Sequence, residues 1–363
     1  MRFAPTEEHT EFAAAVRSLL ADTCTPADVA ASWGGEVGSH TGLGSGDGRV
    51  RPAWDALVEM GVLGLLVPEQ HGGIEMEFDA LAPIVEECGR VALPDPVGDT
   101  AGVVAPLLAT VAGQGGAVSG PAAEWLSRIA SGATVVSGFG AAPLVPSGRT
   151  ADAFVLFTDD TLVLVEPDDI ESRPEDSVDG SRGLVRVEPV SGAGLELASG
   201  DVAAAMRAVS FDRAATLDAA MLLGLCSAML DMTVEYVSER RQFGVPVGSF
   251  QAVKHHLADA GSAIVFARPL VAQAAHLLSG GHSALSGGSA TVGESAVAVS
   301  MAKSRASRAA QLVSETALQC HGAIGYTVEA DLQLFMKRSW ALARSHGDEA
   351  MHRARVRRHL LGL

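Results

Sequence analysis

Cysteine is scarce in this sequence, and its spacing excludes the sites that cysteine usually builds. The chain of 363 residues has four cysteines, and no two of them form a Cys-x-x-Cys pair. Disulfide frameworks and structural zinc sites need closely and regularly spaced cysteines. The sequence therefore predicts no metal site and no disulfide scaffold, and it favours a reducing compartment. The four residues are Cys24, Cys88, Cys226 and Cys320.

Basic residues are outnumbered by acidic ones, which limits the partners of the chain. Lysine and arginine number 26 against 43 aspartates and glutamates, so the formal net charge is −17. A negative surface repels nucleic acids and anionic membranes, and neither is expected as a partner. An anionic ligand would need a local basic pocket within this negative field.

Long hydrophobic runs are also missing. The longest apolar stretch, Ala219–Leu230, is interrupted by Gly224 and Ser227 and is shorter than the roughly 20 residues that cross a bilayer. The first residues turn acidic at Glu7 and Glu8 and lack the apolar core of a signal peptide. We therefore expect a soluble, cytoplasmic protein without a membrane span.

Hydrophobic periodicity changes twice along the chain. Residues 1–132 predict a helical domain, with Thr6 as the cap of its first helix. Residues 133–210 contain short β-rich runs instead. Ala153–Phe157 and Thr161–Val165 predict a hairpin, and Val185–Val190 and Leu195–Leu197 predict further strands of a small β domain.

The remaining residues, 211–363, predict a C-terminal four-helix bundle, because apolar residues recur at helical spacing over long segments. The tract Gly280–Gly293 is expected to be a loop. The expected fold is thus mostly α with a small central β module. The four expected helices are 217–239, 250–278, 289–319 and 330–360.

The segment Glu239–Gly244 is the most informative part of the sequence. A helix is expected to end there, and the next to begin near Ser249. Arg240 at the helix end, Gln242 as an amide and Phe243 as a ring suit a pyrophosphate joined to a flat base. An ordinary surface turn between two helices fits the same residue types, so composition leaves both interpretations open.

Three segments resemble the acyl-CoA dehydrogenase family. Arg240–Gly244 matches its Arg-x-(Gln/Thr)-Phe-Gly signature, and Pro246–His255 matches the Pro-x-x-x-Phe-Gln-Ala-x-x-His that follows. Gln319–Thr327 resembles the second signature, and Met60–Gly73 resembles the family's N-terminal Pro-Glu-x-x-Gly-Gly segment. The resemblance covers nearly the whole chain and is weakest in the middle.

The resemblance implies an acyl-CoA dehydrogenase-like fold, FAD as the cofactor and α,β-dehydrogenation of an acyl-CoA thioester. In such enzymes a carboxylate removes the α-proton, the flavin takes a hydride, and an electron-transfer flavoprotein usually reoxidises it. Both signatures typically reach across a dimer interface into FAD held mainly by the neighbouring subunit. The residues implied in cofactor binding are Arg240, Gln242, Phe243, Phe250, Gln251, Gln319, Cys320, His321, Gly322 and Ala323.

The sequence departs from the family in three places. The Thr-Glu-Pro-x-x-Gly-Ser-Asp segment that contacts the flavin is replaced by Val135–Val145, which lacks those side chains. The flavin-stacking tryptophan has no counterpart, since Trp125 and Trp340 lie outside the β domain. The usual catalytic glutamate is absent, because its Tyr-Glu-Gly-Thr segment falls on Ser345–Asp348 and its position holds His346.

Two residues are candidate substitutes for the missing base. His346 is a candidate because histidine is a residue type suited to proton transfer, and Asp218 lies one helical turn beyond Ala214, a position near which some relatives carry the base. Each fits an ordinary helix-end charge as well. The neighbouring His255 and His256 diverge by about 100° on a helix and predict no metal site.

The chain therefore keeps the half of a flavin site that is given to a neighbour and lacks much of its own half. It resembles the short, non-catalytic subunit of actinobacterial α₂β₂ acyl-CoA dehydrogenases of the steroid side-chain type. We expect a subunit that completes FAD sites with a homologous catalytic chain, acting in lipid or steroid catabolism. A self-sufficient homo-oligomer using His346 or Asp218, and a non-enzymatic binding or scaffold protein, stay open. So does the identity of the acyl group.

Overall fold

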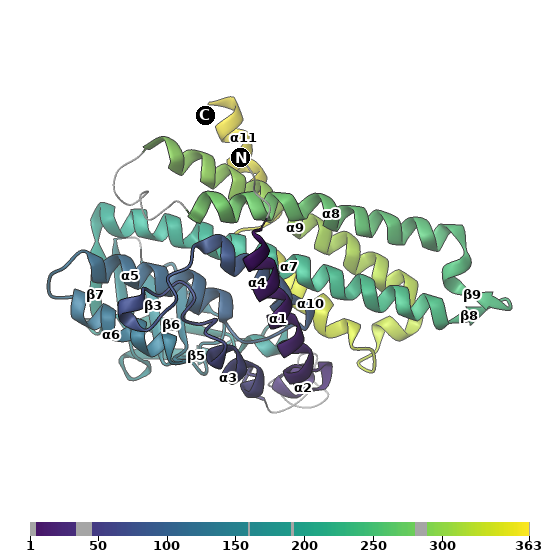
Figure 1. The fold of residues 1–363 in the computed structure, drawn as a ribbon, viewed down its shortest axis with the longest axis horizontal. Coiled ribbons are helices and arrows are strands. Elements are labelled where there is room, and N and C mark those ends of the chain that lie inside the picture. The colour runs from purple at the N-terminus through teal and green to yellow at the C-terminus, as the bar shows by residue number, and fades with distance from the viewer. Residues whose placement is uncertain (1–4, 34–45, 159, 190–191, 280–288, 363) are drawn as a thin grey trace.

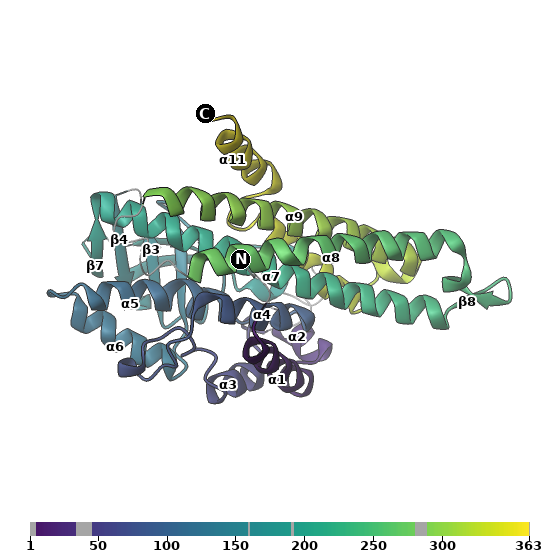
Figure 2. The same ribbon diagram turned by 45° about the horizontal axis from the view of Figure 1, so that its top comes forward.

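The computed structural model describes residues 5–33, 46–158, 160–189, 192–279 and 289–362. Figure 1 shows the sheets at one end of an elongated molecule and a bundle of long helices that runs to the other end. The N-terminal helices cover the side of the bundle next to the sheets, as the turned view in Figure 2 also shows. This arrangement of helices, small β module and bundle confirms the predicted fold class. The division at residues 132 and 210 stays a prediction.

Side-chain caps fix where the first two helices begin. Thr6 accepts a hydrogen bond from the His9 amide, which confirms the predicted cap, and Thr25 and Asp28 form a reciprocal capping box. Apolar residues of this part and of the bundle form one continuous core. The elements are α1 (Glu7–Thr23), α2 (Pro26–Ser32), α3 (Arg51–Glu59), η1 (Glu69–His71), α4 (Phe78–Arg90), the π-helical η2 (Gly98–Val104), α5 (Ala105–Gly113) and α6 (Ser119–Ala130).

The β module consists of two small sheets. One has the order β1-β3-β4-β7 and the other the order β2-β6-β5. The predicted hairpin is confirmed, because β3 and β4 pair antiparallel, whereas β1 pairs parallel with β3, which periodicity did not predict. The strands are β1 (Val135–Phe139), β2 (Leu144–Val145), β3 (Ala153–Phe157), β4 (Thr161–Val165), β5 (Ile170–Pro174), β6 (Val185–Pro189) and β7 (Leu195–Ser199), with the short helices η3 (Pro167–Asp169) and η4 (Gly180–Arg182).

The bundle differs from its prediction at the C-terminal end. The expected single helix 330–360 is wrong, because His346 and Gly347 have φ angles of 48° and 94° and separate two helices. The first helix begins at Gly200 and not at the expected residue 217. The third begins at Ser289, so residues 289–293 of the expected loop are helical, and residues 280–288 lie outside the described residues. The helices are α7 (Gly200–Glu239), α8 (Gln251–Ser279), α9 (Ser289–His321), α10 (Leu332–Arg344) and α11 (Glu349–Leu361).

Two glycines let α4 and α7 approach closely. A Cβ atom on Gly224 would lie 1.9 Å from the Glu86 carbonyl oxygen, and one on Gly89 would lie 2.2 Å from the Met221 carbonyl oxygen. Neither position tolerates a side chain without moving a backbone. The N-terminal domain is therefore held tightly against the middle of α7, where the pocket described below opens.

Two described helices, α7 and α8, have the length and apolar composition of a membrane-crossing helix. The most apolar window of α7 is 72% buried inside the protein, as expected for a core helix, and that of α8 is 33% buried. Length and composition alone are weak evidence for a membrane span.

Candidate functional site

A pocket lies where the N-terminal domain, the β module and the bundle meet. Its walls come from the loop Pro94–Asp99, from β1 with Ser137, from the middle of α7 and from the turn after α10. Its volume is about 100 Å³, well below the roughly 300–1,000 Å³ of typical ligand pockets. The pocket as it stands has room for a small group only.

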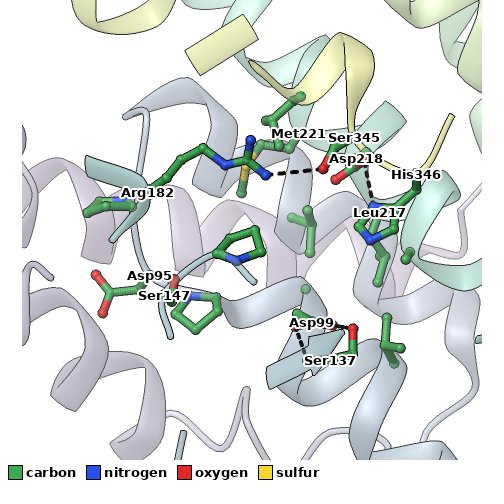
Figure 3. Close-up of a pocket in the computed structure, with 18 of the residues that line it drawn as sticks. Asp95, Asp99, Ser137, Ser147, Arg182, Leu217, Asp218, Met221, Ser345 and His346 are labelled. Atoms are coloured by element: carbon green, nitrogen blue, oxygen red, sulfur yellow. Dashed lines mark hydrogen bonds and ion pairs between the residues drawn. The ribbon is translucent and has the colours of Figure 1, made fainter. Parts of the chain in front are cut away.

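The two candidate bases lie together in this pocket, although 128 residues separate them in sequence. His346 Nδ1 and Asp218 Oδ2 are 2.9 Å apart, and Figure 3 shows this contact at the edge of the pocket. Burial alone would raise the pKa of Asp218, but His346, Lys303 and Arg182 together hold that pKa below its usual value. Asp218 is therefore an ionised partner that orients the imidazole.

The turn that carries His346 is fixed from several sides. His352 Nε2 donates to the His346 carbonyl oxygen at 2.9 Å, and burial lowers the pKa of His352 to about 4, which keeps it neutral. Lys303 Nζ donates to the Leu342 carbonyl oxygen at 2.7 Å. Arg182 donates to Ser345 Oγ at 3.2 Å. A left-handed backbone at a non-glycine residue persists only where its surroundings enforce it, and these contacts do so.

Lys303 is the least expected member of the site. Its side chain is fully buried, its Nζ lies 3.9 Å from Asp218 Oδ2, and burial lowers its pKa to about 8. Sequence reasoning missed it, but a signal exists. Lys303 occupies the same buried helical stripe as Val299, Ala302 and Ala306, where a lysine needs an internal partner.

Asp99 is a second carboxyl group in the pocket, and sequence reasoning missed it too. It accepts hydrogen bonds from the Ser137 amide at 2.7 Å and from Ser137 Oγ at 2.6 Å. Burial nevertheless raises its pKa from 3.8 to about 6. Of the four aspartates that line the pocket, Asp218 has a lowered pKa and Asp99 a raised one, while Asp95 and Asp179 are paired with Arg49 and Arg338.

The raised pKa of Asp99 predicts how stability depends on pH. A protonated Asp99 suits the folded state, so its contribution to stability falls as pH rises from about 4 to about 6. Asparagine cannot ionise, so the Asp99→Asn protein does not lose this stability as the pH rises. We expect Asp99→Asn to gain about 1–3 kcal/mol of unfolding free energy relative to wild type between pH 4 and pH 7. Urea titrations at both pH values test this, and equal differences at both would contradict it.

Aromatic rings fill the space between β1 and His346. Phe139 stacks on Phe157 with ring centroids 4.6 Å apart and meets the His346 ring edge-on at 5.5 Å. Phe211 of α7 also contacts Phe139, at 5.8 Å. The rings pack against His346 beside the pocket, and a pocket of about 100 Å³ has no room for a flavin ring.

The first cofactor motif lies at the far end of the bundle (Figure 1). The strands β8 (Arg241–Gln242) and β9 (Val245–Pro246) form a two-residue hairpin, followed by η5 (Val247–Ser249). Ser249 lies in that turn, and α8 begins at Gln251, one residue after the expected start of the helix 250–278. At the tip, Phe243 has a φ of 53° and is 94% exposed.

The other predicted cofactor residues lie at the same end. Arg240, Gln242, Phe250, Gln251 and Gln319 are exposed, and Phe250 contacts Phe243 with ring centroids 6.4 Å apart. The second motif continues from the last turn of α9 into η8 (Gly322–Tyr326), where His321 stacks on Tyr236 of α7 at 4.5 Å. Cys320 is half-buried, and Gly322 and Ala323 are exposed.

The two groups of predicted residues are far apart in one chain. Asp218 and Arg240 lie on α7 or at its end, 22 positions apart, and a rise of 1.5 Å per residue puts them about 33 Å from each other. That is about the diameter of a small domain. The structure therefore gathers the cofactor residues at one place and His346 with Asp218 at another, and it does not join them.

Comparison with known proteins identifies the family of the chain. The chain matches the family model "Acyl-CoA dehydrogenase, N-terminal domain" over residues 6–133 and "Acyl-CoA dehydrogenase, C-terminal domain" over residues 202–361. It is 30% identical to the acyl-CoA dehydrogenase IpdE2 of Mycolicibacterium smegmatis, over 94% of this chain and 95% of that protein.

Solved structures share the fold over the whole length. The ChsE4-ChsE5 complex from Mycobacterium tuberculosis superposes with a TM-score of 0.79 at 21% identity, covering 100% of both chains. The Tcur3481-Tcur3483 steroid acyl-CoA dehydrogenase gives 0.77 at 23% identity, covering 98% of both. The resemblance stated from the motifs is thus confirmed by matches that span most of the sequence. The chain belongs to the acyl-CoA dehydrogenase family.

Proposed function

We propose that this chain is a subunit of an FAD-dependent acyl-CoA dehydrogenase and completes FAD sites with a homologous catalytic chain in an α₂β₂ assembly. The observation that carries the proposal is the hairpin tip. Phe243 holds a left-handed backbone, which costs about 1–3 kcal/mol, and exposes 94% of its surface. Within its own chain the ring meets Phe250 edge-on at 6.4 Å, a contact that offsets little of this strain. The strained ring therefore fits a contact made with another molecule.

The residue types around the hairpin fit the adenine and pyrophosphate end of FAD. Arg240 offers paired donors to phosphate oxygens, Gln242 offers an amide, and Phe243 offers a face on which a base can stack. Gln319, with its exposed neighbours Gly322 and Ala323, lies at the same end of the bundle. FAD, when bound, accepts the hydride of the dehydrogenation. The task of these residues is to bind and orient the cofactor.

The isoalloxazine end would then belong to the partner. The pocket beside His346 in this chain is about 100 Å³, too small for a flavin ring, and about 33 Å separates Arg240 from Asp218. Two of the similar solved structures are named as two-component assemblies, and one of these is named a steroid enzyme. These names support a homologous partner and a steroid-type acyl-CoA substrate, with an electron-transfer flavoprotein as acceptor. Four free cysteines support a cytoplasmic location.

A second candidate function is a self-sufficient homo-oligomeric dehydrogenase. The observation that favours it is the contact of 2.9 Å between His346 and Asp218 in the position of the missing glutamate. The imidazole would then be the base. The pocket volume of about 100 Å³ argues against a flavin ring beside it, which is why the shared site ranks above this alternative. A pure scaffold does not need Arg240, Gln242 and Phe243 together at one hairpin, which argues against that third function.

Expression of this chain alone and together with a homologous chain from the same genome tests the proposal. We expect little bound flavin in the chain alone, and stoichiometric flavin with acyl-CoA-dependent bleaching in the complex. The measurements are the flavin absorbance after gel filtration and its loss on adding acyl-CoA under anaerobic conditions. Full flavin loading and turnover by the single chain would contradict the proposal and favour the homo-oligomer.

A further inference from the structure

The pocket around His346 holds a proton acceptor with a defined tautomer. Asp218 is ionised, so the hydrogen atom of the 2.9 Å contact belongs to His346 Nδ1. Nε2 then carries a lone pair, and it has no hydrogen-bond partner among the residues that the structure describes. A histidine with one nitrogen fixed by a carboxylate and the other free toward a cavity has the arrangement of a general base.

A proton donor lies on another wall of the same pocket. Asp99 comes from η2, whereas His346 comes from the turn after α10, and Figure 3 shows them in different walls. Ser137 donates to both oxygens of Asp99, which fixes the orientation of the carboxyl group. Where the surroundings shift the pKa values of two carboxyl groups in opposite directions, the group with the raised pKa suits the acid and the other supports the base. The pKa of Asp99 is raised and that of Asp218 is lowered.

The charged groups that face the pair favour an anionic intermediate. Arg182 lines the pocket from η4, Lys303 approaches Asp218 from α9, and His352 is neutral and supports the turn from α11. Asp95 and Asp179 line the pocket as well, but they pair with Arg49 and Arg338. Arg182 and Lys303 are thus left to face the ionised Asp218, and Asp99 is partly protonated because burial raises its pKa to about 6. A negative charge that develops in the cavity would be stabilised by the excess cation.

We propose that this pocket is a flavin-independent acid–base site that moves the double bond of a short 3-enoyl thioester into conjugation with the thioester carbonyl. His346 Nε2 removes a proton from carbon α, breaking that C–H bond, and the electron pair moves the double bond from β,γ to α,β. The Asp99 carboxyl group supplies the proton that forms the new C–H bond at carbon γ. The proton on His346 returns to Asp99 through solvent. Nothing is oxidised or reduced, so no electron acceptor is needed.

The size of the pocket selects the substrate class within this proposal. A cavity of about 100 Å³ admits a short acyl group and excludes a steroid ring system. The thioester part rests on the proposed function, because acyl-CoA is the substrate class of the family. The proton transfer itself rests on the contacts of His346, Asp218 and Asp99. It uses none of the residues that would bind FAD.

The experiment uses 3-butenoyl-CoA in deuterated buffer with the purified full chain, alone or with its partner. We expect the absorbance of the conjugated 2-butenoyl thioester to appear and NMR to show deuterium at carbon γ. His346→Asn should lower the rate by about 10²–10⁴-fold, the usual contribution of a general base. Asparagine is chosen because it tolerates the left-handed backbone at this position. Asp99→Asn should lower the rate by a similar factor, and Asp218→Asn should lower it at least about tenfold.

Two controls separate this site from others. His256→Asn changes an exposed histidine of α8 and should leave the rate unchanged. Removal of the flavin from the complex should also leave the rate unchanged, because neither proton transfer uses FAD. Loss of conversion on flavin removal would assign the reaction to the shared flavin site and overturn the proposal. No conversion by the wild type, or wild-type conversion by His346→Asn, would overturn it as well.

A structural readout guards against variants that simply misfold. The Nδ1 proton between His346 and Asp218 should give a downfield ¹H resonance in the wild type. That resonance should vanish in His346→Asn and in Asp218→Asn but persist in Asp99→Asn. A folded Asp99→Asn protein that keeps the resonance and loses conversion would support Asp99 as the acid. The same protein with full conversion would exclude Asp99 and overturn the mechanism. Flavin loading of the complex is measured separately, so failure of either proposal is recognised by itself.

Discussion

Replacing Asp95 by alanine should lower the free energy of unfolding by about 3–5 kcal/mol, because it leaves a buried cation unpaired. Asp95 and Arg49 form an ion pair whose side chains are 0% and 1% exposed. Asp95 also accepts a hydrogen bond from the Val50 amide at 2.9 Å, where α3 is about to begin. Its removal therefore costs an ion pair and the partner of a buried amide at once.

The surroundings of Arg49 cannot replace Asp95. Arg49 Nη1 already donates to Thr134, Nη2 has no hydrogen-bond partner among the described residues, and the guanidinium lies 4.4 Å from the centre of the Trp54 ring. Urea titration followed by tryptophan fluorescence measures the change, with an unaltered dependence on denaturant. The matched control is Arg51→Ala, which breaks an exposed ion pair with Asp47 and should change stability by at most about 0.5 kcal/mol. Equal effects of the two variants would show that Asp95 does not hold a buried charge.

The sequence predicted the parts of this fold that depend on neighbouring residues. Helical spacing was sufficient for the helical character of residues 1–132 and for the long helices α7, α8 and α9, and the run Ala153–Phe157 with its partner predicted a hairpin. The parallel pairing of β1 with β3 joins segments linked by a crossover, and no local pattern encodes it. The break at His346 also escaped periodicity, because contacts from α9 and α11 enforce the turn.

The candidate site shows the same division. A motif written in consecutive residues, such as Arg240 to Gly244, could be recognised in the sequence, and its residues do gather at one end of the bundle. The assignment of FAD contacts to them stays a prediction. His346 and Asp218 were named singly, but their contact depends on how α7 packs against the turn after α10. Asp99 and Lys303 belong to no motif, and only burial beside other charges marks them.

Arg240→Ala should weaken FAD binding by the complex about 10–100-fold, while Arg241→Ala should change it little. The two arginines are adjacent and exposed, so they form a matched pair. Only Arg240 occupies the first position of the signature that places a guanidinium against the pyrophosphate. A hydrogen bond to a charged group contributes about 1.5–3 kcal/mol, and about 1.4 kcal/mol corresponds to a factor of ten in the dissociation constant.

The measurement is reconstitution of the flavin-depleted complex with FAD, followed by flavin fluorescence. A general loss of positive charge would weaken binding equally in both variants, because each removes one cation from the same hairpin. A specific contact with the pyrophosphate separates them. Phe243→Ala should fall between the two, since stacking of a base on an aromatic ring contributes about 1–3 kcal/mol. If Arg240→Ala and Arg241→Ala bind FAD alike, the hairpin does not contact the cofactor. The strain at Phe243 would then have to serve protein contact alone.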